Sequence, residues 1–263
     1  MTRKIVAIGG GGNGRPYDGV TPSPYEIKKI DEEIVRLTNK SNPNVLFLAQ
    51  AQPIERQFLN YEVIKKNYGA LGCNVRYLDN NDLLDKEKTT EYFAWSDIIF
   101  ETGGDTMTMI DIWKKTGVDK LLYDAWIQGK VLSGVSAGAN CWFKECSTDS
   151  IRIQKNDFTL PLTKCDCLGF INAFYTPHCD SEGREESTID LLKDSPLTGI
   201  LISNCCALEI VDDKYRLITC DTSLQKIDKA YGLKIYYKNG VLHRKYIDDS
   251  DSFKDLDDLL RQE

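Results

Sequence analysis

Short apolar runs alternate with amphipathic stretches along the first half of the chain. The run Lys4–Ile8 is followed by Pro24–Asn39, in which Ile27, Ile30 and Ile34 recur at helical spacing. The alternation continues, with strands expected over Asn44–Ala49, Asn74–Leu78, Asp97–Glu101 and Lys130–Leu132, and helices over Glu55–Leu71, Thr89–Ala94, Thr106–Thr116 and Leu121–Gln128. This order predicts parallel strands joined by right-handed crossovers.

The pattern changes in the second half of the chain. Ala207–Ile218 and Leu233–Ile247 each have the pattern of a β-hairpin, the second turning at Asn239-Gly240. No linker rich in Pro, Gly or Ser interrupts the elements, so residues 1–263 are expected to form one domain. The sequence therefore predicts a three-layer α/β fold with a mainly parallel central sheet and antiparallel hairpins in its C-terminal part.

Composition narrows the class of partner. Of the 263 residues, 41% are hydrophobic and 28% are charged, which is ordinary for a globular protein with a substantial core. The net charge of -7 argues against nucleic acid, because binding phosphates requires clustered Lys and Arg. A peptide or another small molecule is the better expectation.

The distribution of apolar residues and cysteines indicates a cytoplasmic protein. No run of about 18 apolar residues occurs, and the start Met1–Lys4 lacks the pattern of a signal peptide, so no membrane segment is expected. The nine cysteines are odd in number and form no Cys-x-x-Cys pair, which is typical of reduced thiols. Cys165 and Cys167 are too closely spaced to be the usual chelating pair, so no metal site is expected.

The segment Gly134–Asn140 has the G-x-S-x-G pattern of a nucleophile elbow, with Ser136 at its centre. Such a turn between a strand and a helix exposes the serine hydroxyl, and its small neighbours permit the sharp backbone. A plain tight turn before a helix rich in small residues is the alternative. The glycines of Gly9–Gly14 lack the spacing of a dinucleotide-binding loop and are expected to let the chain turn beside an active-site crevice.

Two histidines are available to activate the serine. His178 follows an apolar strand at Pro177, where a catalytic side chain at the edge of a sheet would lie, whereas His243 falls inside a hairpin and is expected to be an ordinary strand residue. His178 would take the proton of Ser136 during attack and return it to the leaving amine.

A third group should orient the imidazole, and an oxyanion requires backbone donors. Asp149 and Asn204 are both candidates for the third group, although Asp149 can equally be a solvated loop acid and Asn204 can bond its own backbone in a turn. The N–H groups of Ala137 and Gly104 are the candidate oxyanion donors, since one follows the nucleophile and the other follows the preceding strand.

Three ordered motifs extend this interpretation, namely Phe100–Thr106, Lys130–Asn140 and Thr176–His178. In order and spacing they resemble the peptidase E family of serine peptidases, which includes dipeptidase E (alpha-aspartyl dipeptidase) and is related to cyanophycinase. The resemblance covers most of the chain. It implies a fold like that of class I glutamine amidotransferases, with serine at the elbow.

Carried over to this sequence, the resemblance implies Ser136 as nucleophile, His178 as base, and Gly104 with Ala137 as oxyanion donors. It also implies an acidic residue at a position beyond the serine, and Asp149 lies nearest to that position in this chain. A second acid of the family pattern falls at Asn204, where this chain departs, and an amide stabilises an imidazolium less than a carboxylate does.

The same resemblance suggests a substrate. Dipeptidase E-like enzymes cleave after an N-terminal aspartate, whose carboxylate Arg184 would hold; a surface ion pair with neighbouring glutamates is the alternative for this arginine. Asp105, assigned to the substrate site, stands where dipeptidase E commonly has asparagine and is more like cyanophycinase. The loop between His178 and Arg184 is also shorter than in dipeptidase E, so the linkage cleaved stays open.

The sequence thus predicts a serine peptidase acting on short peptides, with dipeptides carrying an N-terminal aspartate as the expected substrates and with no metal or organic cofactor. A cyanophycinase-like or other isopeptide hydrolase and a ligand-binding homologue without turnover are the alternatives. The sequence leaves the oligomeric state open, a homodimer included.

Overall fold

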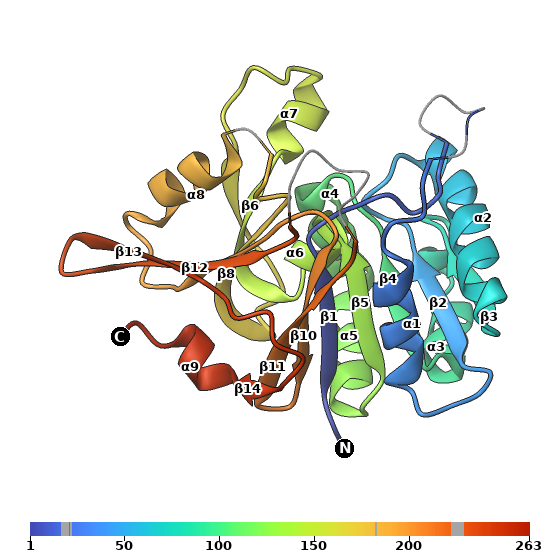
Figure 1. Ribbon diagram of the computed structural model, residues 1–263. Helices are drawn as coiled ribbons and strands as arrows, with labels where there is room; N and C mark the ends of the chain where they lie inside the picture. Colours follow the sequence, from blue (N-terminus) through green and yellow to red (C-terminus); the bar gives the residue numbers. More distant parts are fainter. Residues whose placement is uncertain (17–20, 22, 182, 222–228) are drawn as a thin grey trace.

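A computed structural model describes residues 1–263 except 17–20, 22, 182 and 222–228 (Figure 1). Within this described part, the strands form an eight-stranded sheet and a six-stranded sheet. The larger sheet has the order β14-β11-β10-β1-β5-β4-β2-β3. Its members are β1 (Lys4–Ile8), β2 (Asn44–Leu48), β3 (Asn74–Leu78), β4 (Ile98–Glu101), β5 (Val131–Val135), β10 (Cys206–Val211), β11 (Lys214–Thr219) and β14 (Lys254–Asp255).

Neighbouring strands from β1 to β3 in this order are parallel, as the alternation of strands and helices predicts. The strands β10, β11 and β14 extend the sheet on the other side of β1 in antiparallel pairs. The register places Ile8 beside Val135, so that β1 and β5 end at the same edge of the sheet.

The smaller sheet has the order β13-β12-β9-β8-β6-β7. Its members are β6 (Phe143–Thr148), β7 (Thr163–Asp166), β8 (Ile171–Pro177), β9 (Gly199–Ile202), β12 (Gly232–Lys238) and β13 (Val241–Tyr246). Here β6, β8 and β9 are parallel and the other pairs antiparallel. This second sheet corrects the expectation of one central sheet, because alternation along the chain predicts strands without deciding which strands pair.

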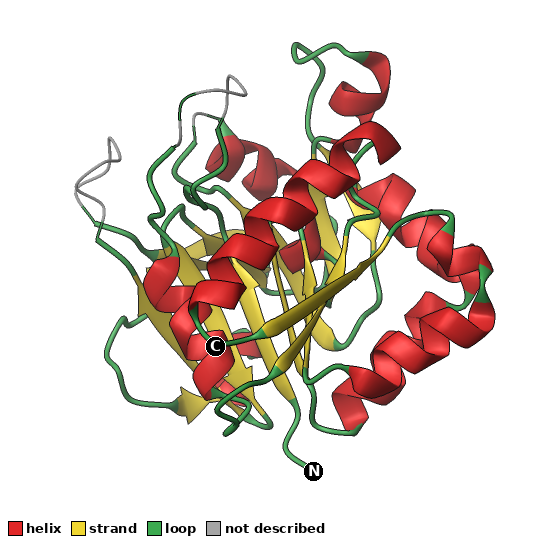
Figure 2. Cartoon of the chain, turned by 90° about the vertical axis from the view of Figure 1, so that its right-hand side faces the viewer, coloured by secondary structure: helices red, strands yellow, loops and turns green. Residues whose placement is uncertain are grey.

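Helices cover both faces of the larger sheet. On one face lie α1 (Lys28–Arg36) and α2 (Ile54–Ala70), and on the other lie α3 (Lys86–Trp95), α4 (Thr106–Thr116) and α5 (Val118–Ile127). The other described helices are α6 (Ala137–Asn140), α7 (Ser150–Lys155), α8 (Arg184–Leu192), which packs on the smaller sheet, and α9 (Leu256–Leu260), with a 3-10 turn, η1, at Asp82–Leu84. Figure 2 shows helices lying across the strands. Among the described helices, none combines the length and the apolar character needed to cross a membrane.

Alternating side chains of β1 pack into two different hydrophobic clusters, one on each face of the larger sheet. Val6 and Ile8 of β1 pack in a cluster with α1 and α2, while Ile5 and Ala7 pack in a cluster with α3, α4 and α5. The second cluster also includes Tyr175 of β8, whose hydroxyl donates to the carbonyl oxygen of Ala7 at 3.2 Å. The two sheets therefore share a hydrophobic core, and β8 lies close to β1 (Figure 1).

Candidate active site

The elbow forms where β5 ends. Ser136 has φ 57° and ψ -112°, a sparsely populated backbone conformation for a residue with a side chain. Its N–H donates to the carbonyl oxygen of Ile8 at 3.1 Å, which ties the turn to the end of β1. Helix α6 begins at the next residue, Ala137, so the N–H of Ala137 has no partner within the helix.

Close backbone packing holds this turn against β4. A Cβ atom on Gly134 or on Gly138 would overlap the carbonyl oxygen of Glu101 at the end of that strand. Neither position can carry a side chain without moving the backbone. The glycines of the G-x-S-x-G pattern therefore bring α6 onto the sheet, and the serine is held by the packing beneath it.

The imidazole of His178 is oriented by an amide. Its Nδ1 lies 2.8 Å from Oδ1 of Asn204. Asn204 is held in turn by Asp180, whose carboxylate accepts from the Asn204 N–H at 2.7 Å and from its Nδ2 at 2.9 Å. Because the amide nitrogen faces Asp180, the amide oxygen faces the ring, and Nδ1 of His178 carries the hydrogen while Nε2 keeps its lone pair.

Asp180 was not predicted from the sequence, whereas Gly10 belongs to the glycine-rich loop that was expected beside an active-site crevice. A Cβ atom on Gly10 would overlap both Oδ1 of Asn204 and the ring of His178. The glycine-rich loop after β1 thus leaves room for the contact between ring and amide. The polar loop after Pro177 was the available signal for Asp180, but spacing alone does not show that it bonds Asn204.

The environment of His178 favours its neutral form. Desolvation, followed by the positive charge of Arg184, lowers the pKa of the ring below its ordinary value of 6.5. The bond to Asn204 acts in the opposite direction and is weaker. A neutral imidazole near pH 7 is the form that can accept a proton.

Ser136 and His178 face one pocket with a volume of about 440 Å³. Its lining consists of Gly11, Gly12, Asn13, Arg15, Gln52, Thr102, Gly103, Gly104, Val135, Ser136, His178 and Asn204. Across the described residues, no hydrogen bond joins the Ser136 hydroxyl to the ring. Such contacts commonly tighten only when a substrate binds.

The turn after β4 forms another part of the pocket wall. Gly104 has φ 145°, and a Cβ atom there would overlap the carbonyl oxygen of Ala51. The turn is pinned at two points, since Gln52 donates its side-chain amide to the Gly103 oxygen and the Asp105 N–H donates to Ala51 at 2.8 Å. Gly104 and Ser136 thereby line the same pocket, as expected for an oxyanion donor and its nucleophile.

Asp149 requires a correction as the group that orients the imidazole. Its Oδ2 accepts from Nη2 of Arg184 at 2.9 Å, whereas Nδ1 of His178 contacts Asn204. Of the two candidates left open by the sequence, the structure brings only Asn204 to the ring. The same ion pair engages Arg184, whose side chain is only 15% exposed and is absent from the pocket lining.

Asp105, expected in the substrate site, caps helix α4. Its carboxylate accepts from the N–H and the hydroxyl of Thr108 and from Gln154. Burial raises the pKa of Asp105, but these hydrogen bonds outweigh it and keep the pKa below its usual range. The residue is 8% exposed and is absent from the lining of the Ser136 pocket, so the role that its described contacts support is that of a helix cap.

Arg15 is the pocket-lining cation that the sequence analysis missed. Its Nη1 donates to Oδ1 of Asn60 at 3.0 Å, and the side chain borders the pocket that holds Ser136. A single arginine after a glycine-rich loop has no characteristic spacing, so only the fold could reveal its position. His243, by contrast, lies in β13 and stacks on Tyr236 at 4.8 Å between ring centroids.

Comparison with known proteins identifies a matching family and several relatives. The model of the family described as Peptidase family S51 matches residues 19–218. The uncharacterized peptidase YgaJ of Bacillus subtilis (strain 168) is 28% identical over 239 residues, covering 89% of this chain and 91% of that protein. The uncharacterized peptidase Lmo0363 of Listeria monocytogenes is 31% identical over 154 residues, covering 57% of this chain and 73% of that protein.

Two solved structures share the fold. The crystal structure of a peptidase from an acI-B1 Actinobacterium has a TM-score of 0.71 at 17% identity and covers 97% of each chain. A candidate peptidase E protein from Listeria monocytogenes EGD-e has a TM-score of 0.59 at 22% identity, covering 84% of this chain and 100% of that one.

Proposed function

The chain belongs to peptidase family S51, and on that premise we propose that it is a serine peptidase that hydrolyses short peptides through an acyl-enzyme. The observation that carries the proposal is the 2.8 Å contact between Nδ1 of His178 and Asn204. It leaves Nε2 free to accept a proton in the pocket that Ser136 also lines. We further propose the layer arrangement of class I glutamine amidotransferases for this fold.

In the proposed reaction, Ser136 Oγ attacks the scissile carbonyl carbon while Nε2 of His178 takes its proton. The protonated ring then gives this proton to the leaving amine, and the acyl group stays on Ser136. Water, deprotonated by the same ring, then attacks the ester carbonyl; the bond to Ser136 Oγ breaks, the ring returns its proton to that oxygen, and the acid is released. The strained elbow and the neutral imidazole support both steps.

The tetrahedral intermediate places negative charge on the former carbonyl oxygen. We assign the N–H groups of Gly104 and Ala137 to this oxygen, because the two residues flank the serine from the turn after β4 and from the start of α6. Each donor of this kind contributes about 3 kcal/mol to lowering the barrier.

The family resemblance points to dipeptides with an N-terminal aspartate. We assign the aspartate carboxylate to Arg15 in preference to Arg184, since Arg15 borders the pocket and Arg184 is paired with Asp149. A guanidinium can bind a carboxylate through two parallel hydrogen bonds. Arg15→Gln should therefore raise KM for Asp-Leu about tenfold or more and leave KM for Ala-Leu unchanged, whereas Arg184→Gln should change both alike.

The proposed activity is tested by measuring leucine release from Asp-Leu, its β-aspartyl isomer and Ala-Leu. Ser136→Ala should lower kcat for Asp-Leu at least about 10³-fold. Ser133→Ala is the matched control, because this serine lies in β5 just before the elbow, donates to the Val6 oxygen and is not part of the pocket lining. Preference for the β-aspartyl isomer would favour an isopeptide hydrolase instead.

If none of the three dipeptides is hydrolysed, the next measurement is labelling of the protein with a serine-directed phosphonate. Label on Ser136 would retain the hydrolase and move the proposal to another acyl substrate. Failure to label Ser136 in the folded protein would contradict the serine peptidase and favour a ligand-binding homologue without turnover.

A further inference from the structure

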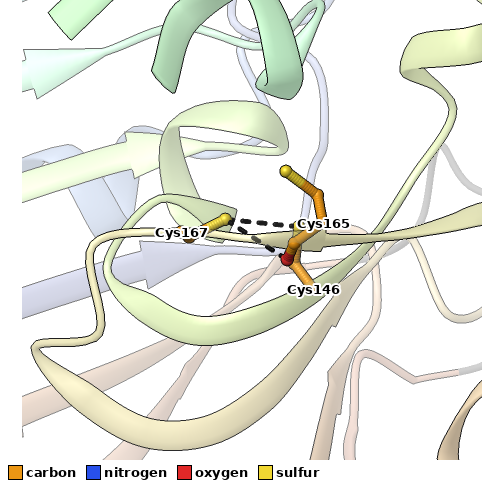
Figure 3. A group of neighbouring side chains, drawn as sticks. All are labelled: Cys146, Cys165 and Cys167. Carbon is orange, nitrogen blue, oxygen red and sulfur yellow. Dashed lines mark hydrogen bonds between the residues drawn. The ribbon is translucent and has the colours of Figure 1, made fainter. Parts of the chain in front are cut away.

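Three cysteines meet behind the elbow helix. Cys146 of β6 is the cross-strand partner of Cys165 on β7, and Cys167 follows β7 directly. Their sulfur atoms all lie within 4.8 Å of one another, and those of Cys146 and Cys167 are 3.5 Å apart (Figure 3). This cluster of three thiols, Cys146, Cys165 and Cys167, is separate from the pocket of Ser136.

The sulfur positions nearly match those of a metal site. With metal–sulfur bonds of about 2.3 Å, tetrahedral coordination places sulfur atoms about 3.8 Å apart. The cluster needs adjustments of no more than about 1 Å to reach that arrangement. Thiolates select soft d10 ions over Mg²⁺ and Ca²⁺, which prefer oxygen.

We propose that Cys146, Cys165 and Cys167 bind one thiophilic d10 cation, either Zn²⁺ or Cu⁺. Each ligating thiol releases its proton to solvent as the metal–sulfur bond forms. The sequence predicted no metal here, because Cys165 and Cys167 alone are too close to be the usual chelating pair. The third ligand comes from the neighbouring strand, and its position becomes visible only in the folded chain.

Charge and access favour this site. Lys114 of α4 lines the same pocket as Cys167 and brings a positive charge to this side of the cluster. Three thiolates around Zn²⁺ carry a net charge of -1 by formal count, which Lys114 would offset. Cys167 is partly exposed and borders, with Lys114, a pocket of about 470 Å³ through which an ion can enter.

The position of the cluster suggests what bound metal would stabilise. The N–H of Cys167 donates to the Lys144 oxygen at 3.0 Å, and the N–H of Leu168 donates to Cys141 at 3.0 Å, directly after α6. Metal bound here would link β6 to β7 and so brace the segment that leaves the elbow. The proposed ion is therefore a structural clamp, distinct from the chemistry at Ser136.

The test begins with reduced, metal-free, full-length protein. Zn²⁺ and Cu⁺ are titrated separately against a competing chelator, and Co²⁺ replaces Zn²⁺ to reveal sulfur-to-metal charge transfer. We expect one ion per chain, with the tighter ion identifying the occupant. Cys165→Ser and Cys167→Ser should each weaken binding by more than about 10-fold, the loss caused by disturbing even an outer partner of a metal ligand.

Cys220→Ser is the matched control, because this cysteine is also partly exposed and lies outside the cluster. It should leave binding unchanged. A second measurement uses the unsubstituted chain: metal should slow alkylation of Cys167, read by mass spectrometry, and leave Cys220 unaffected.

Three results would overturn the proposal. The first is that the chelator retains both Zn²⁺ and Cu⁺ in the competition, so that the protein binds neither ion. The second is that Cys165→Ser and Cys167→Ser bind metal as tightly as the unsubstituted chain. The third is that Cys167 is alkylated at the same rate with and without metal.

Discussion

At the scale of single residues, the group that contacts the imidazole of His178 is an amide, where the family pattern has a carboxylate. A second residue, which does carry a carboxylate, holds this amide in place. Asn204 faces the His178 ring, and Asp180 holds Asn204 through two hydrogen bonds. A neutral amide orients the ring but stabilises an imidazolium less than a charged group in contact would. In our proposal Asp180 supplies the charge from one residue further away and also prevents the Asn204 amide from flipping.

Asp180→Asn should lower kcat about 10- to 100-fold while leaving KM nearly unchanged, because Asn204 is then free to turn its nitrogen toward the ring. The measurement is kcat and KM for the substrate found with the dipeptide panel. Asp190→Asn on the exposed face of α8 is the control and should match wild type. Unchanged kcat in Asp180→Asn would remove Asp180 from the proposed site.

The pH dependence of kcat/KM should follow the ionisation of His178. Desolvation and the charge of Arg184 lower its pKa below 6.5, so kcat/KM should rise with pH through an inflection below that value and stay level at neutral pH. Arg184→Gln removes the positive charge and should move the inflection upward. Lys193→Gln, an exposed cation paired with Asp190, should leave it in place. An inflection above 6.5 in wild type would contradict the proposed base.

At the scale of elements, the elbow depends on how closely α6 approaches β4. Gly134 and Gly138 both face the carbonyl oxygen of Glu101, and the Glu101 side chain is itself buried with its pKa raised well above the ordinary value by desolvation. This contact sets the height of α6 above the sheet and hence the exposure of Ser136.

Gly138→Ala should destabilise the fold by about 1–3 kcal/mol, since its Cβ would overlap backbone that cannot move freely. The measurement is the free energy of unfolding from urea titration. Gly69→Ala is the matched control, because it lies in α2 with open space around the new methyl group and should stabilise by about 0.5–1 kcal/mol. Equal effects at the two sites would contradict the packing argument.

At the scale of the whole molecule, a buried acid links folding to pH. Asp31 of α1 accepts hydrogen bonds from the hydroxyls of Tyr25 at 2.6 Å and Tyr68 at 2.9 Å. Desolvation outweighs these bonds and raises its pKa from 3.8 to about 7. Between these values the folded chain keeps a proton that the unfolded chain has released.

Asp31 should therefore make global stability fall as pH rises from about 4 to about 7, with no further loss above that range. The effect amounts to about 4 kcal/mol at most. Asp31→Asn should flatten this part of the profile, measured as the free energy of unfolding at several pH values. Asp111→Asn, on the exposed side of α4, is the control. An unchanged slope in Asp31→Asn would contradict the assignment.

The sequence determined most local features of this protein. Periodicity located the parallel strands from Lys4–Ile8 to Asp97–Glu101, and the glycine pattern around Ser136 predicted the sharp turn that its φ of 57° displays. These features depend on neighbours in the chain, because side-chain period and glycine backbone freedom act over a few residues. The order and spacing of three short motifs also indicated the family, which can be recognised from the sequence without the fold.

Tertiary structure decided which distant residues meet. It divided the strands after the elbow between the two sheets, placed Asn204 instead of Asp149 against His178, and brought Arg15 to the pocket. It also gathered Cys146 with Cys165 and Cys167. These contacts join residues from different strands and loops, and their distances depend on strand pairing and core packing, which local sequence patterns do not specify.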